Sequence, residues 1–263
     1  MSQNESVNQT FWEHLDELRG TLIKSASVTT LFSIVAFIFK DELFAIVLAP
    51  GYSDFITYRL LYYISSMFDA NESADFSVQL INTGLAEQFI IHMKTALCAG
   101  LLCASPYIIY QLLRFISPAL YSNERKCTIY GVGSGYLMFI IGILVSYYII
   151  FPLTFRFLGT YQVSGDVTNM ITLESYMSTL IIMSLSMGVI FEMPVLAWIF
   201  AKLGVINAEF MRKYRKHAIV IILIIAAIIT PTSDIFTLLV VSMPMCLLYE
   251  ASIMIAANTK KAL

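Results

Sequence analysis

The chain is poor in charge and lacks the short motifs of several enzyme classes. Only 13% of its 263 residues are charged, and no polar segment is long enough to fold as a soluble domain. It has no G-x-x-x-x-G-K-[ST] loop, no His-Glu-x-x-His and no detectable internal repeat. The four cysteines are not spaced as Cys-x-x-Cys, and the formal net charge of −2 argues against a nucleic-acid partner. We therefore predict no metal, no cofactor and no enzymatic activity.

Long apolar runs are abundant instead. The chain has six of them: Thr21–Phe39, Phe89–Tyr110, Thr128–Phe151, Ser175–Phe200, Ala218–Thr230 and Ile235–Ala257. A bilayer core needs about 20 helical residues to cross, and five of these runs reach that length. Ala218–Thr230 has 13 residues and covers about two thirds of a ~30 Å core. The sequence therefore predicts an all-α integral membrane protein.

The distribution of Lys and Arg predicts the orientation and the number of spans. Twelve of these residues lie on the side shared by both termini, and four lie on the other side. By the positive-inside rule, the side with twelve is cytoplasmic. If Ala218–Thr230 did not cross, Lys260 and Lys261 would lie outside. We therefore predict six transmembrane helices with cytoplasmic termini, the short span thinning the bilayer or tilting its neighbours.

One membrane domain, 1–263, follows from this topology. Its connecting segments are a cytoplasmic amphipathic helix at 1–20, outer loops at 40–88 and 152–174, and cytoplasmic loops at 111–127 and 201–217. The N-terminal helix has an apolar stripe made of Phe11, Leu15, Leu18 and Leu22. Its acidic face is made of Glu13, Asp16 and Glu17. Such a helix at the membrane boundary is either a plain interfacial anchor or a binding surface.

The first cytoplasmic loop carries a second acidic position. Pro118 ends the preceding helix, and Ser122 or Asn123 can cap the next one. Glu124 then falls in the first turn, where the helix dipole stabilises a carboxylate. From this loop alone, a structural role and a binding role for Glu124 both remain open.

A third acid, Glu192, lies inside an apolar run. An ionised carboxylate costs about 2.5–3.5 kcal/mol at the centre of a membrane helix, so Glu192 should be protonated, paired or facing water. Pro194 frees the carbonyl of Ile190, so Glu192 has either a functional role or one in local helix repair. Asp234, at the start of the last run, similarly either caps a helix or serves function.

Two further patterns make structural predictions. Gly131 and Gly135 are four residues apart in the third run and predict a close helix-packing face. Glu87 and Lys94, seven residues apart on one face, are expected to pair.

Taken in order, these segments resemble the TatC family, the multispanning receptor subunit of the twin-arginine protein translocase. His14-Leu-Asp-Glu-Leu-Arg19 is similar to the family's N-terminal motif, and Pro118-Ala-Leu-Tyr-Ser-Asn-Glu-Arg125 to that of its first cytoplasmic loop. Phe191-Glu-Met-Pro194, Thr230-Pro231 with Asp234, and Leu248-Tyr-Glu250 follow in the family's order. The resemblance covers nearly the whole chain.

The resemblance implies a concave, glove-like bundle that binds twin-arginine signal peptides on its cytoplasmic face. It implies that Glu17 and Glu124 recognise the arginine pair, with Arg19 and Arg125 beside them in the same motifs. A guanidinium fork matches a carboxylate bidentately, which a lysine ammonium cannot do. The resemblance also places Glu192 in a membrane-embedded groove, and it marks three further sensitive positions: Pro50, Phe115 and Asp234.

Partners and location are implied in the same way. The expected partners are single-span subunits of the TatA or TatB type, folded cargo with its signal peptide, the lipid bilayer, and further copies in a homo- or hetero-oligomer. The expected location is the bacterial cytoplasmic membrane, with the proton-motive force as energy source. Thr21, Lys126 and Thr237 depart from residues common in the family, and the outer segment 52–80 is longer than usual.

Two other classes of function were weighed. A proton-coupled small-solute carrier would use Glu192 as its proton site, but the chain lacks the inverted repeat that such carriers often show. An intramembrane hydrolase would need a nucleophile and a base, whereas His92 and His217 lie near opposite ends of their spans and are expected at the interfaces.

Overall fold

The computed structural model describes residues 11–67, 79–116, 125–164, 169–230 and 234–260, and these are almost entirely helical. The elements are α1 (Phe11–Ile38), α2 (Lys40–Leu48), η1 (Ala49–Gly51), α3 (Ile56–Met67), β1 (Leu80–Ile81), α4 (Glu87–Ile116), α5 (Arg125–Val145), η4 (Ser146–Ile150), α6 (Phe151–Thr160), β2 (Ile171–Thr172), α7 (Leu173–Ile190), α8 (Met193–Lys202), α9 (Ala208–Lys213), α10 (Arg215–Ile229) and α11 (Ile235–Lys260).

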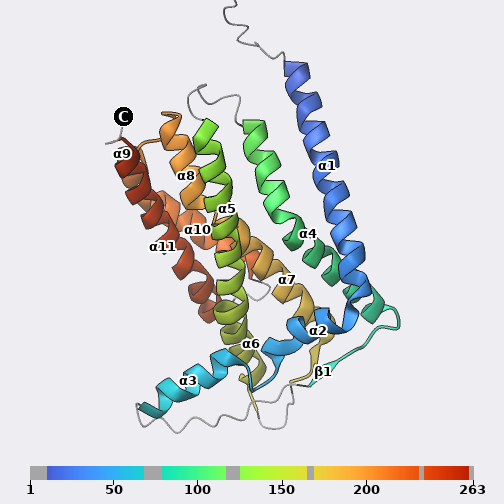
Figure 1. Ribbon diagram of the computed structural model, residues 1–263. Helices are drawn as coiled ribbons and strands as arrows, with labels where there is room; N and C mark the ends of the chain where they lie inside the picture. Colours follow the sequence, from blue (N-terminus) through green and yellow to red (C-terminus); the bar gives the residue numbers. More distant parts are fainter. Residues whose placement is uncertain (1–10, 68–78, 117–124, 165–168, 231–233, 261–263) are drawn as a thin grey trace, which may run out of the picture.

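Within the described residues, five helical stretches are long and apolar enough to cross a membrane. They are Leu15–Ile38, Glu87–Phe115, Gly131–Thr160, Leu173–Lys202 and Ile235–Thr259. The third is continuous through α5, η4 and α6, and the fourth consists of α7 and α8 with a break between them. The start of α1 and the end of α11 lie at the same face of the bundle (Figure 1). Two chain ends on one face agree with an even number of crossings.

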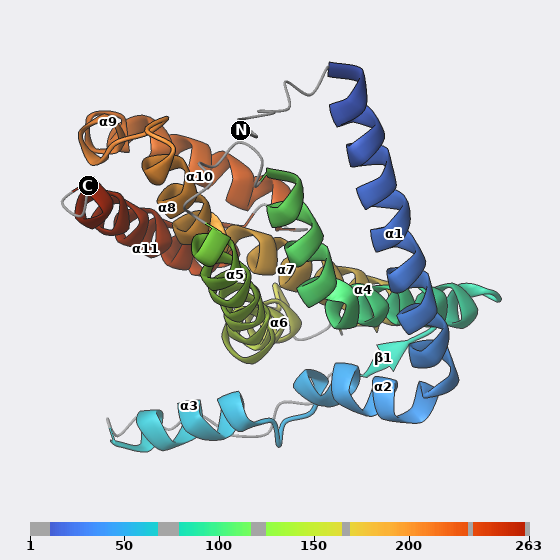
Figure 2. The same ribbon diagram turned by 45° about the horizontal axis from the view of Figure 1, so that its top comes forward.

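Helix α1 is one uninterrupted helix of 28 residues. The sequence predicted a separate amphipathic helix along the membrane surface before the first span, and this prediction is wrong for the described residues. The apolar stripe of its first turns continues into the span, so no signal ends the helix. Helix α1 packs along α4 at one side of the molecule (Figure 2). Their backbones approach most closely where Gly100 faces Ser33, because a Cβ atom at Gly100 would overlap Ser33.

The central crossing is between α5 and α7. A Cβ atom on Gly142 would lie 2.5 Å from the carbonyl oxygen of Met187, and one on Gly188 would lie 2.8 Å from the Phe139 ring. Small residues allow this close approach in membrane helices. The predicted packing face at Gly131 and Gly135 is confirmed, since both are buried against neighbouring helices.

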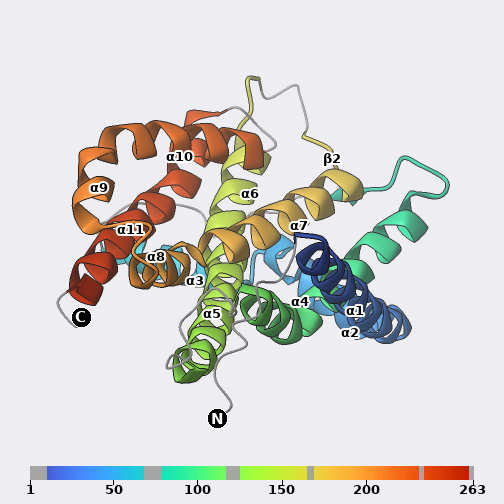
Figure 3. The same ribbon diagram turned by 90° about the horizontal axis from the view of Figure 1, so that it is seen from above.

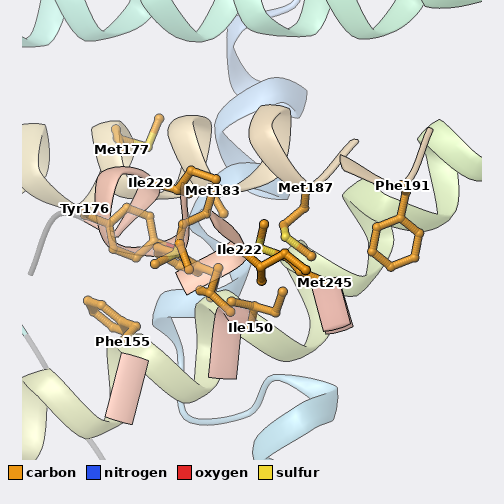
Figure 4. Close-up of a cluster of buried hydrophobic side chains, with 14 of the residues drawn as sticks. Ile150, Phe155, Tyr176, Met177, Met183, Met187, Phe191, Ile222, Ile229 and Met245 are labelled. Atoms are coloured by element: carbon orange, nitrogen blue, oxygen red, sulfur yellow. The ribbon is translucent and has the colours of Figure 1, made fainter. Parts of the chain in front are cut away.

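A methionine-rich core holds α10 and α11 against α7 and the outer half of the third span (Figure 4). It contains Ile150, Phe155, Tyr176, Met177, Met183, Met187, Ile222, Ile229 and Met245. Unbranched methionine side chains fill irregular gaps between helices that cross obliquely. This core fixes the position of the short α10.

Helix α10 has 15 residues and is about 22 Å long, less than a ~30 Å hydrocarbon core. Seen from above, it runs across the view, whereas α1 is seen nearly end-on (Figure 3). Only Ile222, Ala226 and Ile229 are buried along it. The sequence predicted a short span that thins the bilayer or tilts its neighbours, but α10 itself is the oblique helix.

The face predicted to be outer carries a helical cap, residues 40–67, where the sequence predicted only a loop. Helices α2 and α3 lie at the end of the bundle opposite the start of α1 (Figure 1). Three tyrosine hydroxyls donate hydrogen bonds across its contacts with the bundle. Tyr147 donates to Ile46 at 2.6 Å and Tyr176 to Val47 at 3.1 Å, while Tyr58 donates to Pro50 at 2.9 Å and Pro152 at 3.2 Å. Three of these four hydrogen bonds tie the cap to the third and fourth spans.

Candidate functional site

The start of α1, the end of α4 and the start of α5 lie at one face (Figure 1). This face is predicted to be cytoplasmic, and we call it the cytoplasmic rim. On α1, Glu17 is half-buried and makes contacts, and Arg19 is exposed. At the end of α4, Phe115 is half-buried. Glu124 lies outside the described residues. Arg125 is the first residue of α5, and its side chain also lies outside the description. The described backbone therefore brings the start of α1 and the start of α5 to the same end of the bundle.

Glu192 lies at the break between α7 and α8. Pro194 has no N–H, so the helix cannot continue regularly through this point. The Glu192 N–H donates to Val189 at 3.1 Å, and its carbonyl accepts from Leu196 at 2.9 Å. Its side-chain Oε1 is buried and has no hydrogen-bond partner within the part of the chain that the structure describes. The helix-repair alternative, a bond from this carboxyl to the Ile190 carbonyl, is therefore not formed.

The Glu192 carboxyl borders a groove of about 360 Å³ between α4, α5, α7 and α8. The walls are almost wholly apolar and include Leu101, Ile109, Leu112, Phe139, Val195 and Ile199. Ser105 also lines the groove, but its hydroxyl donates to the Leu102 carbonyl at 2.6 Å. Glu192 is thus the one ionisable side chain among the residues described as lining this groove.

Gly135 makes room for that carboxyl. A Cβ atom at Gly135 would lie 3.1 Å from Glu192 Oε2 and 3.3 Å from Ile109. A larger residue there would displace the acid from the groove wall. The glycine spacing predicted a packing face, but nothing local in the sequence indicated that the acid packs against it.

The other predicted positions have structural contacts. Pro50 is buried in η1, and its carbonyl accepts the hydrogen bond from Tyr58. Asp234 accepts a hydrogen bond from the Thr237 N–H at 2.7 Å through its Oδ1 atom, as expected for a helix N-cap. This hydrogen bond supports the interpretation of Asp234 as the N-cap of α11.

One sequence prediction about polar residues near the outer side is wrong. Lys94 pairs with Glu174 at 3.2 Å, and not with Glu87, which accepts bonds from the Thr83 and Gly84 N–H groups. The error arises because Glu174 comes from another segment of the chain. His92 is buried, with its ring stacked on Phe37 at a centroid distance of 4.0 Å, and its position at the membrane interface stays a prediction.

Sequence reasoning also missed the contacts that hold the second cytoplasmic loop. Arg215 at the start of α10 forms an ion pair with Glu250 of α11. The Tyr249 hydroxyl donates to the carbonyl of Met211 in α9 at 2.9 Å. Tyr249 and Glu250 are adjacent in α11 and hold α9 and α10, respectively, against this last helix.

Comparison with known proteins gives a consistent result over almost the full length. The family model described as Sec-independent protein translocase protein (TatC) matches residues 13–244. A Sec-independent protein translocase protein TatC of Blattabacterium sp. is 34% identical, with 98% of this chain and 99% of the relative covered. The TatC of Aquifex aeolicus is also 34% identical, covering 95% and 96% respectively.

Solved structures agree with the sequence relatives. A crystal structure of a twin-arginine translocase receptor, TatC, superposes with a TM-score of 0.76 at 34% identity. The match covers 94% of this chain and 100% of that chain. It confirms the prediction of an all-α integral membrane fold with six spans, α10 included.

Proposed function

Because the chain belongs to the TatC family, the receptor subunit of the Sec-independent twin-arginine translocase, we propose that its cytoplasmic rim reads the arginine pair through Glu17 and Glu124. The protein is a non-enzymatic core component of a translocase that exports folded proteins, driven by the proton-motive force. The comparisons give no support to the small-solute carrier that was the alternative. The rim residues and their roles are our proposal.

The observation that carries this proposal is the convergence of the two motifs at one end of the bundle. Glu17 is on the second turn of α1, and Arg125, next to Glu124, begins α5 at the same face (Figure 1). We propose that Glu17 and Glu124 match two adjacent guanidinium groups, each through a bidentate pair. We assign Arg19 and Arg125 a positioning role beside these acids.

The proposal is tested by titrating the reconstituted protein with a twin-arginine signal peptide. Glu17→Gln and Glu124→Gln should each weaken binding at least about tenfold, because each leaves a guanidinium without its charged partner. Glu209→Gln is the matched control, since Glu209 is an exposed acid on cytoplasmic α9. Unchanged affinity in both rim variants, with helicity and insertion preserved, contradicts the assignment.

We propose a separate intramembrane role for Glu192 at the groove. The support is its unpartnered Oε1 atom and the apolar walls around it. A carboxyl in such a place is protonated or faces water or a ligand, since an isolated buried charge is costly. Our proposal is that the groove is accessible from the aqueous phase or filled by a bound segment.

Accessibility at position 192 can be measured after the four native cysteines are replaced. Glu192→Cys should react with a membrane-impermeant thiol reagent. Ala104→Cys is the control, because Ala104 is fully buried on α4. Equal protection at both positions would show that the groove is closed to water.

Our proposal for the assembly follows the family resemblance. Six helices with few polar faces cannot enclose a pore wide enough for a folded protein, so single-span TatA- or TatB-type subunits are needed. We assign the protein to the bacterial cytoplasmic membrane with both termini inside, as a multi-pass component of a larger oligomer. Pro50, Phe115 and Asp234 are also proposed as sensitive positions: Pro50 lies in η1, Phe115 lies near the end of α4, and Asp234 caps α11.

A further inference from the structure

A cluster of exposed basic side chains lies where the second cytoplasmic loop meets the shortest span. Arg212 and Lys213 end α9, and Arg215 and Lys216 begin α10. We call these four residues the basic patch. Within the described residues, only Arg215 of the four has an acidic partner, Glu250. The patch therefore has uncompensated positive charge.

Aromatic rings lie directly beside the patch, at helical spacing. The Phe210 and Tyr214 rings are 4.7 Å apart, and Tyr214 and His217 are 5.6 Å apart. Phe210 is 54% exposed and Tyr214 is 41% exposed. The Lys213 ammonium lies 6.0 Å from the Tyr214 ring centroid. Amphipathic rings next to cations are typical of the headgroup level of a membrane.

The position of α10 brings this patch close to the bilayer interior. The helix is only about 22 Å long and runs obliquely at mid-height in the bundle (Figures 1 and 3). A short span is accommodated when headgroups are drawn toward it and flanking cations reach out to them. The first turn of α10 also has no side-chain cap, which leaves its N–H groups available to an anion.

The lower part of the same helix presents an apolar wall. Ile219, Val220 and Ile224 on α10 are exposed. This wall begins within one turn of the basic patch and continues toward the outer side. The combination of anion-binding cations above and an apolar wall below matches a phospholipid, with its phosphate at the patch and its chains along α10.

We propose that the basic patch binds the headgroup phosphate of an anionic phospholipid of the cytoplasmic leaflet. The bound lipid holds the headgroup layer down at the inner end of α10, which allows a helix of this length to complete a crossing. The occupant is a lipid because the patch and the exposed wall of α10 are continuous. An acidic segment of a partner subunit would use the cations without needing the wall.

The test compares two variants that each lose two exposed cytoplasmic cations. Arg212→Gln with Lys216→Gln removes half of the patch and leaves the Arg215–Glu250 ion pair intact. Lys24→Gln with Arg114→Gln is the matched control on α1 and α4. Each full-length protein is reconstituted in phosphatidylcholine vesicles, and its association with spin-labelled phosphatidylglycerol and phosphatidylcholine is measured by electron paramagnetic resonance.

The parent protein should prefer phosphatidylglycerol over phosphatidylcholine. In the patch variant the ratio of the two association constants should fall about tenfold. The control variant should change by less than about twofold, and excess inorganic phosphate should not displace the lipid. Equal losses in both variants would mean a diffuse positive surface and would overturn the site. Displacement by inorganic phosphate, absence of preference in the parent, or a patch variant that keeps the full preference would overturn it as well.

Discussion

The outer and cytoplasmic ends of the bundle are stabilised in different ways. At the outer end, the hydroxyls of Tyr58, Tyr147 and Tyr176 bind backbone carbonyls of the cap, and β1 pairs with β2. At the end predicted to be cytoplasmic, the described contacts include the exposed Arg215–Glu250 ion pair. The comparison sets a frame held by tyrosine hydroxyls against a surface held by exposed charges.

The frame follows from the ends of short helices. Carbonyls at the end of a helix lack part of its regular hydrogen bonding, and leaving them unpaired near the membrane costs free energy. The carbonyls of Ile46 and Val47 at the end of α2 accept hydrogen bonds from the hydroxyls of Tyr147 and Tyr176, which are carried on the third and fourth spans. Exposed ion pairs at the other end contribute little, because water screens both charges.

Separating the two central helices should have the largest effect, since both ends depend on that crossing. Gly142→Val places atoms against Met187 and Phe191 and should lower the free energy of unfolding by about 3 kcal/mol. Gly133→Val on the same helix is the control, because nothing lies within 4 Å of its Cβ position. Denaturant unfolding of the reconstituted protein measures both. Equal losses would mean that helix propensity, and not the crossing, is responsible.

Removing a cap hydroxyl should have an intermediate effect. Tyr58→Phe leaves the carbonyls of Pro50 and Pro152 without this donor and should cost about 2 kcal/mol of unfolding free energy. Tyr63→Phe on the same helix should cost almost nothing, since Tyr63 is 65% exposed whereas Tyr58 is 5% exposed. If the two variants unfold alike, the cap is not held by this bond.

Breaking the cytoplasmic ion pair should have the smallest effect. Glu250→Gln removes the charged partner of Arg215 and should change the free energy of unfolding by no more than about 0.5 kcal/mol. Lys94→Gln, which breaks the similarly exposed Lys94–Glu174 pair at the outer end, should behave the same way. A loss of several kcal/mol from Glu250→Gln alone would erase the contrast between the two ends.

The sequence predicted the spans because each depends on local composition. The run Ser175–Phe200 corresponds to α7 and α8, and Pro194 indicated where they separate. The cap contacts could not be predicted in this way. Tyr176 and Val47 are 129 residues apart, and no local pattern specifies such a partner.

The candidate site was also predicted only in part. An acid within an apolar run identified Glu192 as unusual before any geometry was known. The glycine at position 135 that accommodates it and the walls from α4 depend on how distant helices pack. The continuous α1 shows another limit of sequence-based prediction. An amphipathic pattern does not indicate where one helix ends and the next begins.

Photo-crosslinking at the cytoplasmic rim tests the central claim most directly. A photoreactive residue is placed at position 17 or at position 124, so that each variant keeps the other carboxylate, and the reconstituted protein is exposed to a twin-arginine signal peptide and to its twin-lysine counterpart. Our account predicts crosslinks from both positions to the arginine peptide and few to the lysine peptide, since only a guanidinium pairs bidentately with a carboxylate. Equal crosslinking of the two peptides would contradict recognition by Glu17 and Glu124.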